Sequence, residues 1–189
     1  LLFLNNDTTV EEGWLDRLVA TFEDDPAIGV AGSAMLALDG TLSESGGIIW
    51  AFAEGWNWGR GQDPDDPAYS FLRDTDYVSG AALMIERTLF EALHGFDPLY
   101  APGYYEDTDL AFRVRAQGRR VVVQPASRIV HIGGATAGKD VQGPGMKRFQ
   151  TINREKFYAR WKDTLLTHRL AGHDPAREAE RTARRSLWF

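Results

Sequence analysis

The sequence predicts an α/β domain, because short apolar segments that suit strands alternate with segments whose apolar residues recur at helical spacing. Hydrophobic residues make up 43% of the 189 residues, which is enough for a sizeable core. We expect one domain over residues 1–166, followed by a polar helical tail or linker over 167–189.

The predicted strands are the segments in which apolar residues dominate. Residues 1–4 suit a buried strand of a parallel sheet. Further strands are expected at 27–36 and 77–86, and a last pair at 119–125 and 127–134, separated by Pro125 and Ala126.

The predicted helices have apolar residues at helical spacing and recognisable ends. The first is expected within residues 9–26, with Pro26 beyond its end, and the others at 87–97, 104–118 and 145–166. Residues 39–75 are rich in Gly, Asp, Pro and Trp without clear periodicity, so we expect a long surface excursion there.

Charge and cysteine content exclude several functional classes. The formal net charge of -6 argues against a mainly electrostatic nucleic-acid binder. The absence of cysteine excludes disulfides, thiolate zinc sites and cysteine nucleophiles.

The first candidate site is the run Asn5, Asn6 and Asp7 directly after the first predicted strand. Strand ends of this kind collect ligands in α/β sheets, and a carboxylate there can hold a divalent cation that neutralises a pyrophosphate. The alternative is a plain turn in which Asp7 caps the following helix.

The second candidate site is the acidic start of the predicted helix at 104–118. Acidic residues at a helix N-terminus commonly compensate the helix dipole, which is the alternative reading of Glu106 and Asp107. Asp107 and Asp109 are separated by about 200° around a helix, so one can face a crevice while the other pairs with Arg113 at i+4. An ionised aspartate in the crevice would suit a general base.

His131 lies in an apolar strand segment and is followed by Gly133 and Gly134. A lone His in a strand is commonly a core residue. Together with an aspartate at another strand end, it would make a mixed oxygen and nitrogen metal site. We therefore expect Asp7 and His131 to lie close enough to share one cation.

Three stretches, FLNNDTTVEEGWLDRLV, YVSGAALMIERTLFEALHGFDPLY and YYEDTDLAFRVRAQGRRVVVQPASRIVHIGG, resemble successive landmarks of family 2 glycosyltransferases, over roughly residues 1–160. The resemblance implies the GT-A fold, a Rossmann-related mixed sheet flanked by helices. The Asn-Asn-Asp variant of the Asp-x-Asp motif resembles the rhamnosyltransferase-like branch. Because a nucleotide-reading portion precedes this motif in the family, we expect the chain to be the metal- and acceptor-binding part of a longer domain.

The resemblance implies a role for each matching residue. Asp7 would bind a divalent metal, Mn²⁺ or Mg²⁺, with His131 as second ligand, and Asn5 and Asn6 would lie at the bound nucleotide. Asp107 would be the catalytic base, with Glu106 as the next candidate. The segments that shape the acceptor pocket would contain Gly80, Ala81, Phe96 and Asp97.

The resemblance implies a metal-dependent hexosyltransferase, inverting at the transferred sugar, that uses a nucleoside-diphosphate sugar and a saccharide or lipid-linked saccharide acceptor. Such an enzyme would act in bacterial cell-envelope polysaccharide biosynthesis, in the cytoplasm or peripherally at the inner face of the membrane. We expect the chain alone to bind nucleotide weakly and the exposed flank of the first strand to favour self-association.

Two other functions remain open from the sequence. The tryptophan-rich stretch at 50–60 would suit a non-catalytic carbohydrate-binding or interaction module, and Asp and His ligands would also suit a metal-dependent phosphohydrolase. The segment from Ala53 to Tyr69, which contains Trp56 and Trp58, is predicted to be a mobile acceptor-side loop. The alternative is that the two tryptophans pack on the sheet.

Overall fold

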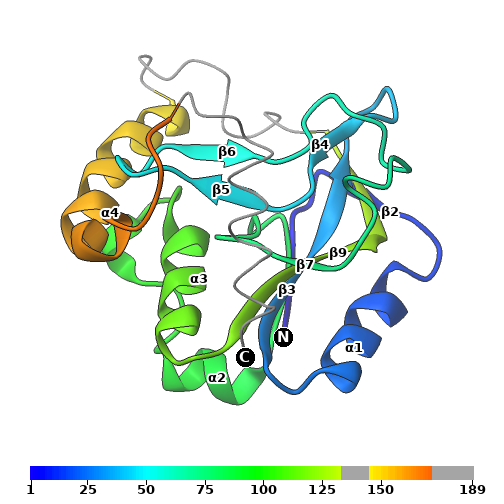
Figure 1. Ribbon diagram of the computed structural model, residues 1–189, viewed down its shortest axis with the longest axis horizontal. Helices are drawn as coiled ribbons and strands as arrows, with labels where there is room; N and C mark the ends of the chain where they lie inside the picture. Colours follow the sequence, from blue (N-terminus) through cyan, green and yellow to red (C-terminus); the bar gives the residue numbers. More distant parts are fainter. Residues whose placement is uncertain (133–144, 172–189) are drawn as a thin grey trace.

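The computed structural model describes residues 1–132 and 145–171, and a mixed β-sheet forms its centre (Figure 1). Its strands follow the order β1-β8-β3-β9-β2, with β4 paired to β3 and β7 paired to β9. A second sheet pairs β5 with β6. The strands are β1 (Leu2–Leu4), β2 (Thr8–Val10), β3 (Ile28–Leu36), β4 (Leu42–Glu44), β5 (Gly47–Ile49), β6 (Gly55–Asn57), β7 (Arg73–Asp74), β8 (Ala82–Ile85) and β9 (Arg120–His131).

The centre of the large sheet is the parallel pair β3 and β9. All nine residues of β3 are buried, as expected for an apolar and small-residue strand covered on both faces. The neighbouring strands β8 and β2 run antiparallel to this pair, so the sheet is mixed, as the sequence predicts.

Helices cover both faces of the sheet (Figure 1). On one face, Leu18 of α1 packs with Ile28 and Val122. On the other, Leu110 and Val114 of α3 lie in the main core. The helices are α1 (Trp14–Asp24), α2 (Arg87–Ala92), α3 (Glu106–Ala116) and α4 (Phe149–Leu165), with short 3₁₀ turns η1 (Pro98–Tyr100) and η2 (Met146–Arg148).

The start of the chain differs from the prediction. β1 pairs antiparallel with β8 at the end of the strand order and is only partly buried, so residues 1–4 do not form a buried strand of a parallel sheet. The apolar character of β1 is explained by packing on both faces of the sheet. Leu2 packs toward α1, and Phe3 packs on Phe90 and Phe96 on the opposite face. The predicted first helix begins only at Trp14, since residues 8–10 pair with β9 as β2.

The predicted surface excursion at 39–75 is correct only for residues 60–72, which are mostly exposed and contain no strand. The rest of the segment supplies β4 to β7. Ile48, Ile49 and Trp50 are fully buried. Gly47 permits this packing, because a Cβ atom there would lie 1.9 Å from the Tyr77 ring. Strands of two or three residues are too short to show a period in the sequence.

The two strands predicted at 119–125 and 127–134 form one continuous strand, β9. Pro125 lies at an irregularity where the partner of Ser33 is Gln124 and the partner of Ala34 is already Arg128. A proline is tolerated at such a bulge because its missing N–H is not required by the ladder.

Two parts of the predictions lie outside the described residues, namely Gly133 and Gly134 and residues 172–189 of the predicted tail. The first residues of that tail pack into the domain. His168 is 6% exposed and its Nδ1 lies 2.6 Å from the carbonyl oxygen of Ile49.

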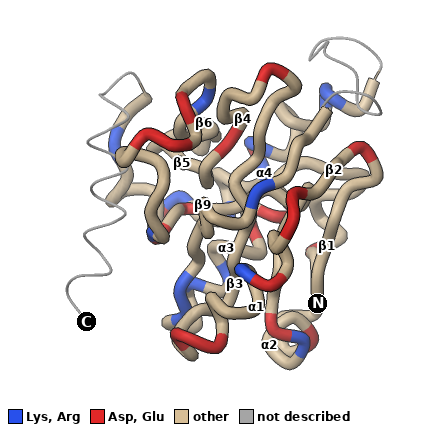
Figure 2. The backbone as a smooth tube through the Cα atoms, turned by 90° about the vertical axis from the view of Figure 1, so that its right-hand side faces the viewer, with Lys and Arg blue, Asp and Glu red and all other residues tan. Residues whose placement is uncertain are grey.

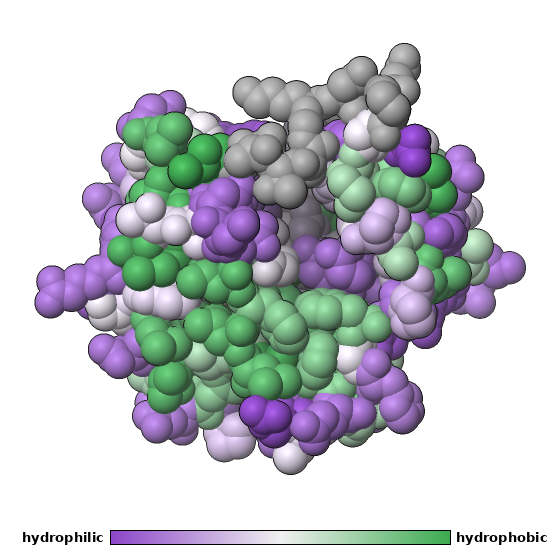
Figure 3. All heavy atoms as spheres, turned by 180° about the vertical axis from the view of Figure 1, so that it is seen from behind, coloured by the Kyte–Doolittle hydropathy of each residue, from purple (hydrophilic) through white to green (hydrophobic). Residues whose placement is uncertain are grey.

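The surface combines mixed charge with one apolar area. Acidic and basic residues are scattered over the whole tube in Figure 2. Apolar side chains gather on the face turned away in Figure 1 (Figure 3). Leu1, Val19, Phe22 and Met84 line a shallow groove beside α1 and β8. Within residues 1–132 and 145–171, no helix has the length and apolar character needed to cross a bilayer.

A buried carboxylate joins α3 to α4 and η1. Asp109 is fully buried, and its Oδ2 accepts a hydrogen bond from Nε of Arg113 at 2.7 Å. Its Oδ1 accepts from Nε1 of Trp161 at 2.8 Å and from the hydroxyl of Tyr100 at 3.2 Å. The pairing of Asp109 with Arg113 is the one that the helical spacing predicts.

We expect Asp109→Asn to lower the free energy of unfolding by about 3 kcal/mol, because the change leaves the partly buried Arg113 guanidinium without its fully buried counter-charge. Urea unfolding of the variant and the wild type measures this difference, with Asp16→Asn on the exposed side of α1 as the control. A change within about 0.5 kcal/mol of the wild type would show that the network is dispensable.

Candidate functional site

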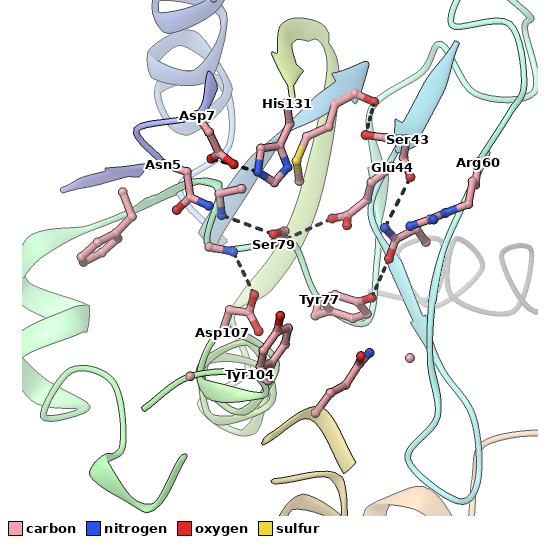
Figure 4. A pocket seen from close by; sticks show the side chains of 18 of the residues that line it. Asn5, Asp7, Ser43, Glu44, Arg60, Tyr77, Ser79, Tyr104, Asp107 and His131 are labelled. Carbon is pink, nitrogen blue, oxygen red and sulfur yellow. Dashed lines mark hydrogen bonds and ion pairs between the residues drawn. The ribbon is translucent and has the colours of Figure 1, made fainter. Parts of the chain in front are cut away.

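A cavity of about 1630 Å³ opens where the first strand, the end of β9 and the N-terminus of α3 meet (Figure 4). Most of the residues that the sequence singles out line it. These are Asn5, Asn6, Asp7, Trp56, Trp58, Gly80, Ala81, Phe96, Glu106, Asp107 and His131.

Asp7 and His131 are held together by backbone pairing. Thr8 of β2 is the partner of His131 at the end of β9, and the carbonyl of Asp7 accepts the N–H of Ile132 at 3.1 Å. Oδ1 of Asp7 consequently lies 3.2 Å from Nε2 of His131. The expected proximity of these residues is confirmed, although most of the chain separates them in sequence.

The two alternative readings of this pair fit the structure only in part. Asn6 and Asp7 do lie in a turn. Asp7 does not cap α1, however, because the N-cap is Gly13, without a side-chain hydrogen bond. His131 is not a core residue, because its side chain is 22% exposed and lines the cavity.

The pair fits a divalent cation as a partial ligand set. It offers one carboxylate oxygen and one imidazole nitrogen, donors that suit Mn²⁺ and, less well, Mg²⁺. The described residues contain no cluster of three or more His, Asp or Glu side chains suited to a metal. Other ligands of such a cation would be water and oxygens of a bound diphosphate.

Backbone strain presents the acidic end of α3 to the cavity. Tyr104 and Tyr105 have φ values of 71° and 73°, a conformation that bulky residues rarely adopt. Tyr105 is held there by a 2.7 Å hydrogen bond from its hydroxyl to the carbonyl of Ala53 and by packing on Phe157. The helix therefore begins with Glu106 and Asp107 at the cavity.

Asp107 is oriented by three hydrogen bonds. Its Oδ2 accepts the N–H of Gly80 at 2.9 Å, and its Oδ1 accepts the N–H of Thr108 at 2.6 Å and the Thr108 hydroxyl at 3.2 Å. Oδ2 keeps a lone pair for a further donor. Compensation of the helix dipole does not explain the hydrogen bond to Gly80, because Gly80 lies on a separate loop outside α3 (Figure 4).

The pKa values of three carboxyl groups in the cavity are raised above their ordinary values. Burial raises the pKa of Asp107, partly opposed by its hydrogen bonds. Burial, and then the negative charge of Asp107, raise the pKa of Glu106 to about 7. Burial likewise raises the pKa of Glu44 to about 7, opposed by the Ser79 N–H. Perturbed groups of this kind cluster at functional sites.

Sequence reasoning missed Glu44 and Ser79. Oε1 of Glu44 accepts the N–H of Ser79 at 3.1 Å, next to the Gly80 N–H that binds Asp107. In the sequence, Glu44 is an acidic residue within the predicted surface excursion at 39–75. A charged side chain in such a segment is ordinarily expected to be solvated, so nothing indicated a buried site residue.

The predicted acceptor residues divide into two groups. Gly80, Ala81 and Phe96 line the cavity, but Asp97 is not among the lining residues. Asp97 instead caps η1 through the N–H of Leu99 at 2.8 Å and pairs with Arg160 at 2.6 Å. Its predicted acceptor contact is therefore not supported.

The tryptophan-rich stretch is a hairpin rather than a loop at Trp56, which belongs to β6 and pairs with Ile48 of β5. Trp56 is 50% exposed and Trp58 is partly buried beside Tyr69. Both line the cavity, so the alternative of two indoles fully buried on the sheet does not hold either.

Known proteins with similar sequences include glycosyltransferases. The chain is 33% identical over 137 residues to the O-antigen biosynthesis protein RfbC of Myxococcus xanthus, an alignment that covers 69% of this chain and 11% of the relative. It is 22% identical over 176 residues to polypeptide N-acetylgalactosaminyltransferase 15 of Mus musculus, covering 89% of this chain and 28% of the relative. The chain thus spans between a tenth and a third of these relatives. No protein-family model matches it.

Among solved structures, the fold is similar to that of GalNAc-T7, crystallised with UDP, GalNAc and Mn²⁺. The TM-score is 0.62 at 17% identity, and the match covers 88% of this chain and 33% of the other. The chain therefore has the GT-A fold. The resemblance to glycosyltransferases that the sequence motifs indicate is confirmed.

Proposed function

We propose that the protein is an inverting glycosyltransferase that moves a sugar from a nucleoside diphosphate to an acceptor hydroxyl. The observation that carries this proposal is the placement of Asp107 in the same cavity as the Asp7 and His131 pair. One group can take the proton of the acceptor hydroxyl, while the pair lies where a diphosphate can be bound. The rhamnosyltransferase-like branch, a lipid-linked acceptor and a role in envelope polysaccharide synthesis belong to the same proposal.

The proposed reaction is a single displacement. The acceptor oxygen attacks the anomeric carbon, the bond from that carbon to the diphosphate oxygen breaks, and Oδ2 of Asp107 receives the hydroxyl proton. Its raised pKa makes the Asp107 carboxylate a stronger base than an exposed aspartate. The Gly80 and Thr108 hydrogen bonds fix the carboxylate, so little reorientation is needed for proton transfer.

Asp7 and His131 would hold the divalent cation, which when bound offsets the charge that develops on the leaving diphosphate. The phosphohydrolase alternative has less support, because two-metal sites gather several carboxylates and imidazoles and the described residues contain no such cluster.

In the Asp107→Asn variant we expect turnover to fall by about 10²-fold or more with donor affinity nearly unchanged, because the amide keeps the shape but accepts no proton. The assay measures nucleoside diphosphate released from UDP-, dTDP- and GDP-sugars. Glu91→Gln, which removes an exposed charge on α2, is the matched control. Near-normal turnover in Asp107→Asn would remove Asp107 from this role and make Glu106 the next candidate.

For Mn²⁺ binding, we expect Asp7→Asn and His131→Ala each to weaken affinity about tenfold or more, since each removes one of two protein ligands. Titration of the ion followed by its electron paramagnetic resonance signal gives the affinity, with Asp16→Asn as the control. Equal affinity in the wild type and both variants would show that the cation is held elsewhere.

A further inference from the structure

The cavity wall formed by β4 and β6 carries a buried carboxyl group that the proposed reaction does not use. Glu44 is 4% exposed, and its Oε1 accepts the N–H of Ser79. No residue in the described part of the chain hydrogen-bonds to Oε2. The carboxyl group points into the cavity from the side opposite His131 and Asp7, above the α3 terminus (Figure 4).

Oε2 of Glu44 is open to the cavity, because it is not one of the fully buried side-chain oxygens that lack a partner within the described residues. It is therefore available to a donor that arrives with a ligand. A hydroxyl that donates to a carboxylate makes a charge-assisted hydrogen bond, which is stronger than a hydrogen bond between neutral groups.

The surroundings of Glu44 have the chemistry of a saccharide site. Trp56 presents a half-exposed indole to the same cavity, a surface on which the apolar face of a sugar ring can pack. Arg60 also lines the cavity, and no described residue forms an ion pair with it. The hydroxyl of Tyr77 and the amide of Asn57, 3.1 Å apart, complete a polar wall. An aromatic face with a few convergent polar groups is typical of small-ligand sites.

Glu44 and Asp107 lie beside the same turn of the chain. Glu44 accepts the N–H of Ser79, Asp107 accepts the N–H of Gly80, and both side chains line one cavity. A ligand bound in this cavity can therefore contact both carboxyl groups.

We infer that Glu44 determines acceptor specificity by binding a second hydroxyl of the acceptor ring, so that the acceptor is a saccharide rather than a polypeptide side chain with one isolated hydroxyl. This inference rests on the proposed glycosyltransferase function. The hydroxyl donates to Oε2 of Glu44, the ring packs against Trp56, and a neighbouring hydroxyl is left at Oδ2 of Asp107.

The test uses methyl glycosides of mannose, galactose and rhamnose, with binding followed through tryptophan fluorescence. We expect saturable binding of at least one glycoside to the wild type and about tenfold weaker binding to Glu44→Ala. Glu91→Gln serves as the control for charge removal, and thermal unfolding shows whether each variant is folded. Glu44→Gln keeps an acceptor for the Ser79 N–H and should bind more weakly than the wild type, because its amide accepts a weaker hydrogen bond than a carboxylate.

Singly deoxygenated forms of the bound glycoside separate recognition from a structural effect. We expect one deoxy form to bind the wild type about tenfold more weakly than the parent glycoside does. The Glu44→Ala variant should bind this deoxy form and the parent glycoside almost equally, because it already lacks the carboxylate to which the missing hydroxyl would donate. No binding of any glycoside to the wild type, or the same deoxy penalty in Glu44→Ala, would overturn the inference. If the wild type releases nucleoside diphosphate from a donor while these results are negative, the inference fails and the proposed function stands.

Discussion

Asp109 lies without solvent contact between α3, α4 and η1, and its carboxylate accepts hydrogen bonds from Arg113, Trp161 and Tyr100. A buried charge of this kind is tolerated only when its oxygens are well satisfied, so the three elements must keep their relative positions. Asn153 of α4 also restrains this region. Its side-chain amide donates hydrogen bonds to the carbonyls of Tyr100, Gly103 and Tyr104. Both residues fix the segment that leads into the N-terminus of α3.

The restraint on residues 100–105 explains how the strained backbone before α3 is maintained. Tyr104 and Tyr105 adopt left-handed conformations immediately before Glu106, and the packed network around Asp109 and Asn153 supplies the restraint that holds them. Asp107 then faces the turn at Ser79 and Gly80, which Glu44 binds from the other side. Two walls of the cavity therefore meet at one turn of the chain.

Much of this arrangement can be predicted from the sequence, for identifiable reasons. Helices such as α1 and α3 are long enough to show apolar periodicity, and Gly118 ends α3 with a φ of 74°, as expected for a helix-terminating glycine. The opposite directions of Asp107 and Asp109 follow from helix geometry alone. The proximity of Asp7 and His131 was expected from the tendency of strand ends to collect ligands in α/β sheets. The contact that produces it, the antiparallel pairing of β2 with the end of β9, was not predicted.

What could not be predicted depends on pairing between distant short segments. The hairpin of β5 and β6 and the burial of Glu44 arise from strands too short to show a pattern, and from the contact of Gly47 with Tyr77. Likewise, Asp97 and Asp107 both lie at the start of a helical turn, and only tertiary contacts place Asp107 in the cavity and Asp97 against Arg160. The GT-A fold follows from the motifs, whereas the cavity wall that contains Glu44 becomes visible only in three dimensions.

The proposed reaction is a single displacement at the anomeric carbon, assisted by one carboxylate, Asp107. It can be tested through the anomeric configuration of the product, determined by nuclear magnetic resonance from a donor sugar of known configuration. We expect the product to have the opposite anomeric configuration to the donor, because the acceptor oxygen attacks the face away from the diphosphate. A product with the donor's configuration would rule out a single displacement.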